Sequence, residues 1–226
     1  MNVAITGAGK GIGLDLVRFF LHAGARVWAC SRNVSALASI RDNQLKAEAL
    51  DLTTASADEI YSSVAAHSDR LDILVHNAAV LINSPFQETA PDDWRHIFET
   101  NVFAAVNVSQ SLIPLLKKSS TPHIIHIGSM GGFQGSSKFP GLSAYSASKA
   151  ALASLTECMA EELKSDGIHV NCLALGAVDT EMLRQAFPGY QAPVSSEDMA
   201  RFIGEFSMNQ RTFFNGKIIP VSSSTP

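Results

Sequence analysis

The sequence is poor in cysteine and has no long apolar run. Its three cysteines, Cys30, Cys158 and Cys172, are odd in number and show no C-x-x-C spacing, which argues against a disulfide scaffold. Each lies in an apolar segment, so we expect three reduced core residues, as in a cytoplasmic protein. No stretch approaches the roughly 20 apolar residues of a membrane span. Val3–Ile5 resembles a strand with no signal-peptide pattern before it.

Basic runs and metal-binding motifs are missing as well. The 17 basic residues are outnumbered by 21 acidic ones, which gives a net charge of −4. With no basic run either, the sequence predicts no positively charged surface for nucleic acid. The seven histidines are scattered without an H-E-x-x-H motif. His123 and His126, three apart on an expected strand, should point to opposite faces. We therefore expect no nucleic-acid partner, no membrane contact and no bound metal.

What the sequence does contain is a regular alternation of short β-branched runs and longer helical stretches. Strands are expected at 3–6, 26–30, 47–50, 73–75, 123–127 and 168–173, and helices at 11–23, 55–67, 92–118 and 144–165. Alternating strands and helices form right-handed crossovers and a parallel sheet covered on both faces. With 46% hydrophobic residues, the sequence predicts a single α/β domain over residues 1–226 with a doubly wound Rossmann-type fold.

The least regular segment runs from Glu181 to Ser195. It combines two prolines and a glycine with four apolar side chains, Met182, Leu183, Phe187 and Tyr190. Long irregular segments with apolar residues often cover active sites. We expect a lid over a site here, and a mobile surface loop is the alternative.

A glycine-rich turn joins the first expected strand to the first expected helix: Thr6-Gly7-Ala8-Gly9-Lys10-Gly11-Ile12-Gly13. Glycines permit a tight turn and let backbone N–H groups approach a phosphate, while the helix N-terminus adds a positive dipole end. The spacing differs from the G-x-G-x-x-G fingerprint, and a purely structural turn is the alternative. Its position between a strand and a helix favours a dinucleotide site.

The second expected strand ends in Ser31-Arg32, where the dinucleotide fingerprint places an acidic residue on the ribose 2′-hydroxyl. Arg32 and Lys10 favour a 2′-phosphate instead, since charge-assisted hydrogen bonds contribute about 1.5–3 kcal/mol each. We therefore expect NADP(H); two solvent-facing charges are the alternative. Asp51, at the end of the third strand, either meets the adenine edge or caps the following helix.

Together these features resemble the short-chain dehydrogenase/reductase family. The resemblance covers nearly the whole chain and rests on the glycine-rich turn and, in the family's order, His76-Asn77-Ala78-Ala79, Asn101, Ser129 and Tyr145-x-x-x-Lys149. It implies an NADP(H)-dependent enzyme that interconverts a carbonyl compound and an alcohol, assembled as a homodimer or homotetramer. It also implies that Asn101 holds a water against the lysine, Ser129 binds the substrate oxygen, and Lys149 holds the nicotinamide ribose.

The spacing of Tyr145 and Lys149 also predicts their chemistry without the family resemblance. At positions i and i+4 of an expected helix they share one face, which brings the ammonium close to the phenol. The positive charge is expected to lower the pKa of Tyr145 from its reference of about 10. Such a tyrosine protonates a carbonyl oxygen in reduction or deprotonates an alcohol in oxidation. Ser129 follows an apolar strand, at the end where open α/β sheets bind ligands.

Three departures from the family pattern concern the late part of the chain. The segment between the serine and the tyrosine is longer than usual, and Gly131–Leu142 is expected to reshape one pocket wall. The family's Pro-Gly pair reads Leu175-Gly176 here, although Thr180 matches. The chain ends early and polar over Val221–Pro226, which leaves the family's usual subunit contacts open.

The expected catalytic set is Asn101, Ser129, Tyr145 and Lys149. The residues expected to contact the dinucleotide are Gly7, Gly9, Lys10, Gly11, Ile12, Gly13, Ser31, Arg32, Asp51, Leu52, Asn77, Ala78, Ala79, Tyr145, Lys149, Gly176, Val178 and Thr180. Two alternatives stay open. A dinucleotide-sensing or scaffold protein without turnover has no need of this acid/base set, and an NAD-linked dehydrogenase is disfavoured by Arg32.

Overall fold

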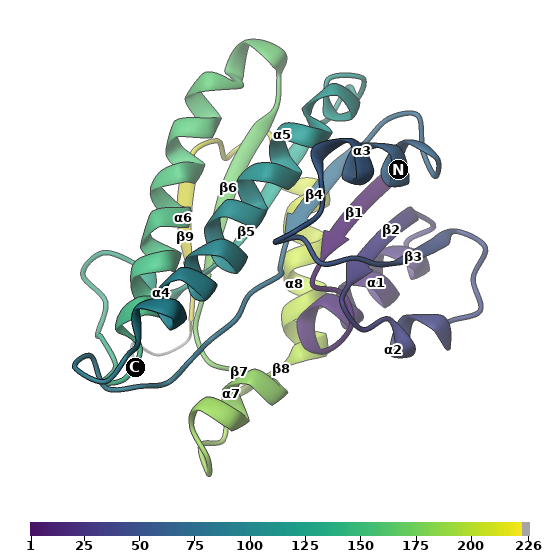
Figure 1. The fold of residues 1–226 in the computed structure, drawn as a ribbon. Coiled ribbons are helices and arrows are strands. Elements are labelled where there is room, and N and C mark those ends of the chain that lie inside the picture. The colour runs from purple at the N-terminus through teal and green to yellow at the C-terminus, as the bar shows by residue number, and fades with distance from the viewer. Residues whose placement is uncertain (223–226) are drawn as a thin grey trace.

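The computed structural model describes residues 1–222, which form a seven-stranded parallel sheet with helices on both faces (Figure 1). The strand order is β3-β2-β1-β4-β5-β6-β9. This order reverses direction after β1, as in a doubly wound Rossmann-type fold, and confirms the predicted fold class. The strands are β1 Asn2–Thr6, β2 Arg26–Ser31, β3 Leu45–Ala49, β4 Ile73–His76, β5 His123–Ser129, β6 His169–Leu175 and β9 Lys217–Val221.

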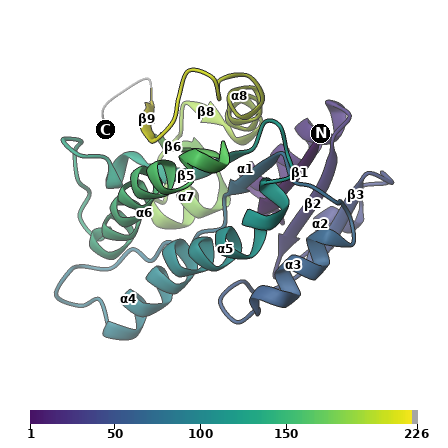
Figure 2. The same cartoon turned by 90° about the horizontal axis from the view of Figure 1, so that it is seen from above.

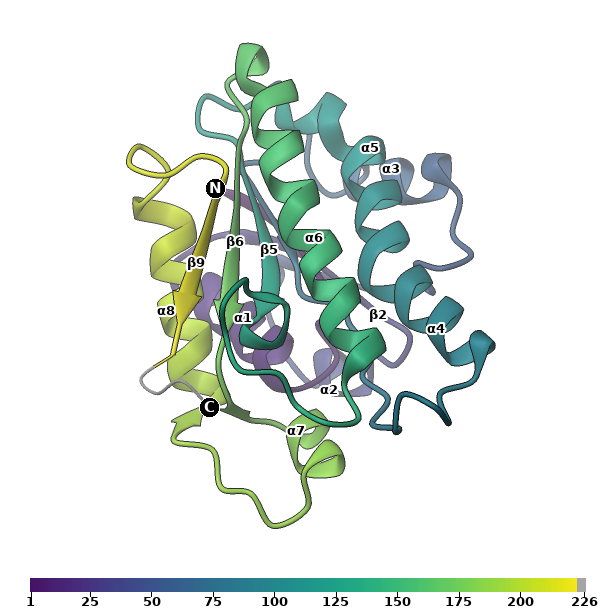
Figure 3. The ribbon, with the colours of Figure 1, turned by 90° about the vertical axis from the view of Figure 1, so that its left-hand side faces the viewer.

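The helices lie mainly in two layers, one on each face of the sheet (Figures 2 and 3). They are α1 Gly11–His22, α2 Ser35–Ala38, α3 Ala57–Ala65, α4 Pro91–Phe98, α5 Ala104–Leu116, α6 Ser143–Glu162, α7 Glu181–Ala186 and α8 Ser196–Asn209. Helices α1 and α8 pack together on one face, and α3, α5 and α6 cover the other.

Alternation along the strands divides the buried side chains between two cores. On β2, Val27 belongs to the core under α1 and α8, and Trp28 to the core under α3 and α5. The expected opposition of His123 and His126 is confirmed: His123 Nδ1 hydrogen-bonds the backbone carbonyl of Ser207 on α8 at 3.0 Å, and His126 Nδ1 the hydroxyl of Thr156 on α6 at 2.8 Å. The central strands are therefore buried on both faces, as in other parallel sheets, whereas the edge strands β3 and β9 are partly exposed.

The helix expected over 92–118 is interrupted. A π-helical turn, Glu99–Phe103, separates α4 from α5. Within this turn Asn101 is 1% exposed, and its side chain bonds the backbone of Val80, accepting from N–H at 2.8 Å and donating to the carbonyl at 3.0 Å. The irregular turn thus coincides with a contact between two residues that are 21 positions apart in the sequence. Helical periodicity did not predict this interruption.

The late part of the chain is more regular than predicted. The expected lid segment contains α7 and a short strand, β8 Val194–Ser195, which pairs with β7 Val178–Asp179. The helix α8 and the edge strand β9 were not predicted, and neither was the short helix α2 earlier in the chain. Pro220 lies within β9, where its missing N–H is tolerated because the strand is at the sheet edge. Of the expected polar terminus, residues 223–226 lie outside the described part.

The expectation for the cysteines is partly wrong. Cys30 and Cys172 are free and buried in the core, but Cys158 is exposed on α6. Only one face of a helix such as α6 packs against the sheet, and Cys158 lies on the opposite, exposed face of this helix. In residues 1–222, no helix is long and apolar enough to cross a membrane.

Candidate active site

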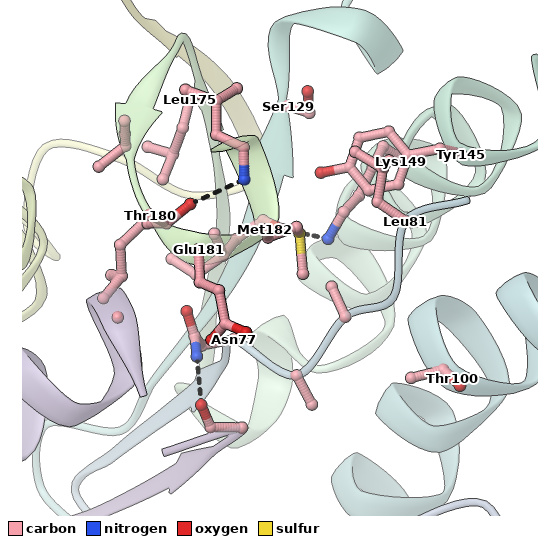
Figure 4. Close-up of a pocket in the computed structure, with 18 of the residues that line it drawn as sticks. Asn77, Leu81, Thr100, Ser129, Tyr145, Lys149, Leu175, Thr180, Glu181 and Met182 are labelled. Carbon is pink, nitrogen blue, oxygen red and sulfur yellow. Dashed lines mark hydrogen bonds between the residues drawn. The ribbon is translucent and has the colours of Figure 1, made fainter. Parts of the chain in front are cut away.

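A cavity of about 550 Å³ opens at the carboxyl ends of the sheet strands (Figure 4). It brings together most of the predicted site residues, from the glycine-rich turn to Ser129, Tyr145 and Lys149. The predicted residues that do not line it are Gly9, Gly13 and Asn101. Its volume falls in the range of ligand sites in proteins, roughly 300–1,000 Å³.

The glycine-rich turn is shaped for close backbone approach. Gly7 has a left-handed φ of 65°, and a Cβ there would lie 2.6 Å from the Cα of Ala78. The Asn77 side-chain amide donates to the Gly7 carbonyl at 2.9 Å, which fastens the turn to the end of β4. Helix α1 begins at Gly11 with no side-chain cap, so its first N–H groups remain available to a ligand.

The far end of the cavity carries the charged residues expected near the adenosine. Arg32 is exposed beyond β2 and forms no side-chain hydrogen bond with another residue in the range 1–222. Asp51 accepts hydrogen bonds from the backbone N–H and the hydroxyl of Thr53, at 3.0 and 2.8 Å, and these bonds lower the pKa of its carboxyl. Lys10 is ion-paired with Glu181 at 2.8 Å, a partner that the sequence did not suggest.

Ser129, Tyr145 and Lys149 meet where the end of β5 faces the start of α6 (Figure 4). The Lys149 ammonium lies 5.7 Å from the centre of the Tyr145 ring and donates a hydrogen bond to the Ile127 carbonyl at 2.8 Å. The Ser129 hydroxyl accepts from the backbone N–H of Gly131 at 3.1 Å. A phenol, a hydroxyl and an ammonium thus share one wall of the cavity.

The expected lowering of the Tyr145 pKa is wrong for the structure described. Burial raises the pKa of Tyr145 to about 12, and a hydrogen bond with Ser129 opposes this only in part. Burial also lowers the pKa of Lys149 to about 8. Desolvation disfavours the charged form of each group, and it is the largest influence on both pKa values.

Asn101 has a different position from the other members of the predicted catalytic set. Besides its bonds to Val80, its amide donates to the hydroxyl of Ser148 at 3.0 Å, and that hydroxyl donates to the carbonyl of Tyr145 at 2.7 Å. Its side chain thus joins the segment after β4 to the catalytic turn of α6. The water expected between Asn101 and Lys149 stays a prediction.

Several residues that shape the cavity were not among the predicted site residues. Gly131–Leu142 was expected to form a wall, and its Phe139 and Leu142 do line the cavity, together with Leu81 from the loop after β4. The segment after Thr180 contributes Met182, Leu183, Phe187 and Tyr190, as expected of a lid. Among residues 1–222, no cluster of His, Cys, Asp and Glu has the arrangement of a metal site.

Comparison with known proteins connects this geometry with a large group of oxidoreductases. The sequence model described as "short chain dehydrogenase" matches residues 1–191. A cyclopentanol dehydrogenase from Comamonas sp. (strain NCIMB 9872) is 32% identical, with 84% of this chain and 78% of the relative covered. A rhamnolipids biosynthesis 3-oxoacyl-[acyl-carrier-protein] reductase from Pseudomonas aeruginosa is 30% identical, with 96% and 93% covered.

Solved structures agree with the sequence comparison. A short chain dehydrogenase from Shigella flexneri 2a str. 301, complexed with NADP, has a TM-score of 0.87 at 26% identity, with 97% of this chain and 95% of that chain covered. Several of the similar structures contain NADP or NADPH.

Proposed function

The chain belongs to the short-chain dehydrogenase family, and from this membership we propose that it interconverts a ketone or aldehyde and an alcohol with NADP(H). One observation carries the proposal. Ser129, Tyr145 and Lys149 line the same cavity as the glycine-rich turn and Arg32. This shared lining supports an acid/base pair and a phosphate-binding turn that act in one continuous site, as hydride transfer from a dinucleotide requires.

The chain's own residues fit a dinucleotide phosphate. The uncapped first turn of α1 and the glycine at position 7, where a Cβ would collide with Ala78, leave room and donors for the pyrophosphate. Arg32 presents an exposed guanidinium for the 2′-phosphate, and Lys10 is a second cation in the glycine-rich turn. When bound, the nicotinamide supplies or accepts the hydride.

The proton is moved by the protein. We assign Tyr145 as the group that donates a proton to the carbonyl oxygen in reduction and removes one from the alcohol in oxidation. Ser129 holds the same oxygen through its hydroxyl, and Lys149 positions the cofactor ribose and supports the phenol with its charge. Asn101 acts through Ser148 as a positioning residue for this turn of α6.

The test is Tyr145→Phe, which removes the hydroxyl and keeps the ring. We expect turnover of a panel of ketones and aldehydes to fall by about 10²–10⁴-fold or more, because no other group replaces the proton donor. Affinity for NADPH, measured by quenching of tryptophan fluorescence, should stay within about twofold.

The matched control is Tyr61→Phe, at a half-buried tyrosine of α3 outside the cavity. Full activity in Tyr145→Phe would refute the mechanism. Binding of NADPH by the unaltered protein without turnover of any carbonyl in the panel would favour a dinucleotide-binding protein without catalysis.

A further inference from the structure

Four of the five charged residues that line the cavity lie outside its catalytic wall of Ser129, Tyr145 and Lys149. The cavity's charged lining residues within the described chain are Lys10, Arg32, Asp51, Lys149 and Glu181. Arg32 and Asp51 follow β2 and β3, which lie toward one edge of the sheet, whereas the catalytic wall lies at the end of β5. Lys10 lies in the glycine-rich turn and fixes Glu181 there through their ion pair. Lys149 is the one charged lining residue on the catalytic wall.

Lys149 is poorly placed to neutralise a substrate anion. It is 3% exposed, lies beneath the Tyr145 ring, and already donates to the Ile127 carbonyl. A substrate carboxylate or phosphate near Tyr145 would therefore be buried without a cation of its own, which is strongly unfavourable.

The wall around the phenol is apolar and comes from three separate segments. The loop after β4 supplies Leu81, the segment before α6 supplies Phe139 and Leu142, and the segment after Thr180 supplies Met182 and Phe187. In Figure 4, Leu81 and Met182 extend into the cavity that also holds Tyr145. A wall of this kind binds hydrophobic surface and offers few hydrogen bonds to a polar substituent.

The three segments are tied together behind the lining side chains. The rings of Phe139 and Phe187 meet edge to face, with centroids 6.1 Å apart. Asn83 does not line the cavity, but its amide donates to the carbonyl of Ala186 at 2.8 Å. The backbone N–H of Ser84 donates to the carbonyl of Gly141 at 3.0 Å. These contacts hold the apolar wall together.

We propose that the substrate of this site is an uncharged, hydrophobic ketone or aldehyde that carries no carboxylate or phosphate. The inference rests on the proposed function in one respect, that the carbonyl oxygen binds at Ser129 and Tyr145. It adds that the remainder of the substrate packs against Leu81, Phe139, Leu142 and Phe187, with no ionic contact.

A matched pair of probes tests the proposal by binding alone. Acetophenone and para-acetylbenzoate share a ring and a ketone and differ by one carboxylate. We expect calorimetric titration of the NADP⁺-loaded protein at neutral pH to give acetophenone an affinity at least about 100-fold higher. Met182→Lys, which brings a cation to the apolar wall, should reduce this preference to about 10-fold or less. Met182→Leu, the matched uncharged variant, should keep it.

Equal affinity for the two probes, tighter binding of the carboxylate, or binding of neither probe would overturn the proposal. Loss of the proposed function gives a different result. If acetophenone is preferred in binding but Tyr145→Phe reduces it as fast as the unaltered protein, the ligand class stands and the catalytic assignment fails.

Discussion

At the scale of single residues, Tyr145 shows burial and hydrogen bonding acting in opposite directions. The hydrogen bond with Ser129 favours the phenolate, whereas desolvation favours the neutral phenol, and burial raises the pKa to about 12. The phenol is therefore protonated at neutral pH, which is the form that donates a proton to a carbonyl. Lys149, with a pKa lowered to about 8, still carries its charge at pH 7.

Arg32 is the residue on which the cofactor preference depends most. Lys10 is engaged by Glu181, whereas the Arg32 side chain makes no hydrogen bond to another residue of the described chain. Arg32→Ala should weaken NADPH by about 10–100-fold, because a charge-assisted bond to the 2′-phosphate is lost. Fluorescence titration with each dinucleotide measures this, and affinity for NADH should change by less than about threefold. Equal losses for the two dinucleotides would refute the 2′-phosphate role.

At the scale of elements, α7 is a short helix held at both ends. Thr180 caps its first turn by accepting from the backbone N–H of Leu183 at 3.3 Å, and Glu181 binds Lys10 of the glycine-rich turn. At the other end, Asn83 holds the carbonyl of Ala186. Six helical residues would not persist alone in water, so these contacts position the helix beside the cavity.

Asn83→Ala should release the last turn of α7. The loss of one hydrogen bond, about 0.5–1.5 kcal/mol, predicts a two- to tenfold fall in kcat/KM for the carbonyl substrate, chiefly through KM. Affinity for NADPH should be unchanged, because the glycine-rich turn does not contact Asn83. Asn43→Ala, at an exposed position between α2 and β3, is the matched control and should leave kcat/KM unaltered. An Asn83→Ala enzyme with unchanged KM would show that the hydrogen bond between Asn83 and Ala186 does not shape the substrate site.

At the scale of the whole molecule, the sheet order places both halves of the site at one edge. The glycine-rich turn and Arg32 follow β1 and β2, while β5 ends in Ser129, and parallel pairing brings all of their carboxyl ends to the same side. Helix α7 lies at this end of the sheet (Figure 1). The single domain over residues 1–226, the homo-oligomer and the cytoplasmic location stay predictions.

Three buried histidines should make stability fall in mild acid. Burial lowers the pKa of His76 to about 3 and of His123 to about 4, and moves that of His126 well below its ordinary value. The unfolded chain takes up protons below about pH 6.5 that the folded chain does not, so unfolding becomes easier as the pH falls and the effect levels off near pH 3–4. Each histidine contributes up to about 1.4 kcal/mol per pH unit in this window.

Urea unfolding between pH 7 and pH 4.5 measures this slope, and a single domain should unfold in one transition. His76→Asn should reduce the slope of the unfolding free energy against pH by at most the contribution of one histidine. His96→Asn, at an exposed position on α4, is the control and should leave the slope unchanged. A free energy of unfolding that does not vary with pH in this window would contradict the assignment of neutral buried histidines.

Features that depend on near neighbours along the chain could be predicted from the sequence alone. Apolar strands alternating with helices predicted the parallel fold, the glycine-rich turn between β1 and α1 predicted a phosphate site, and a spacing of four residues placed Lys149 beside Tyr145. These are local because a strand, a turn and one helical repeat involve only a few consecutive residues. The family resemblance joined them into one site.

Features that depend on distant contacts and on burial emerged from the folded chain and had no signal in the sequence. Lys10 meets Glu181 across 171 residues, and Asn83 reaches Ala186 across 103. Neither pairing has a local pattern. The sign of the Tyr145 pKa shift depends on how completely the phenol is removed from water, and that follows from the packing of the whole site. Periodicity records which side of an element is apolar, but not how deeply a side chain is buried.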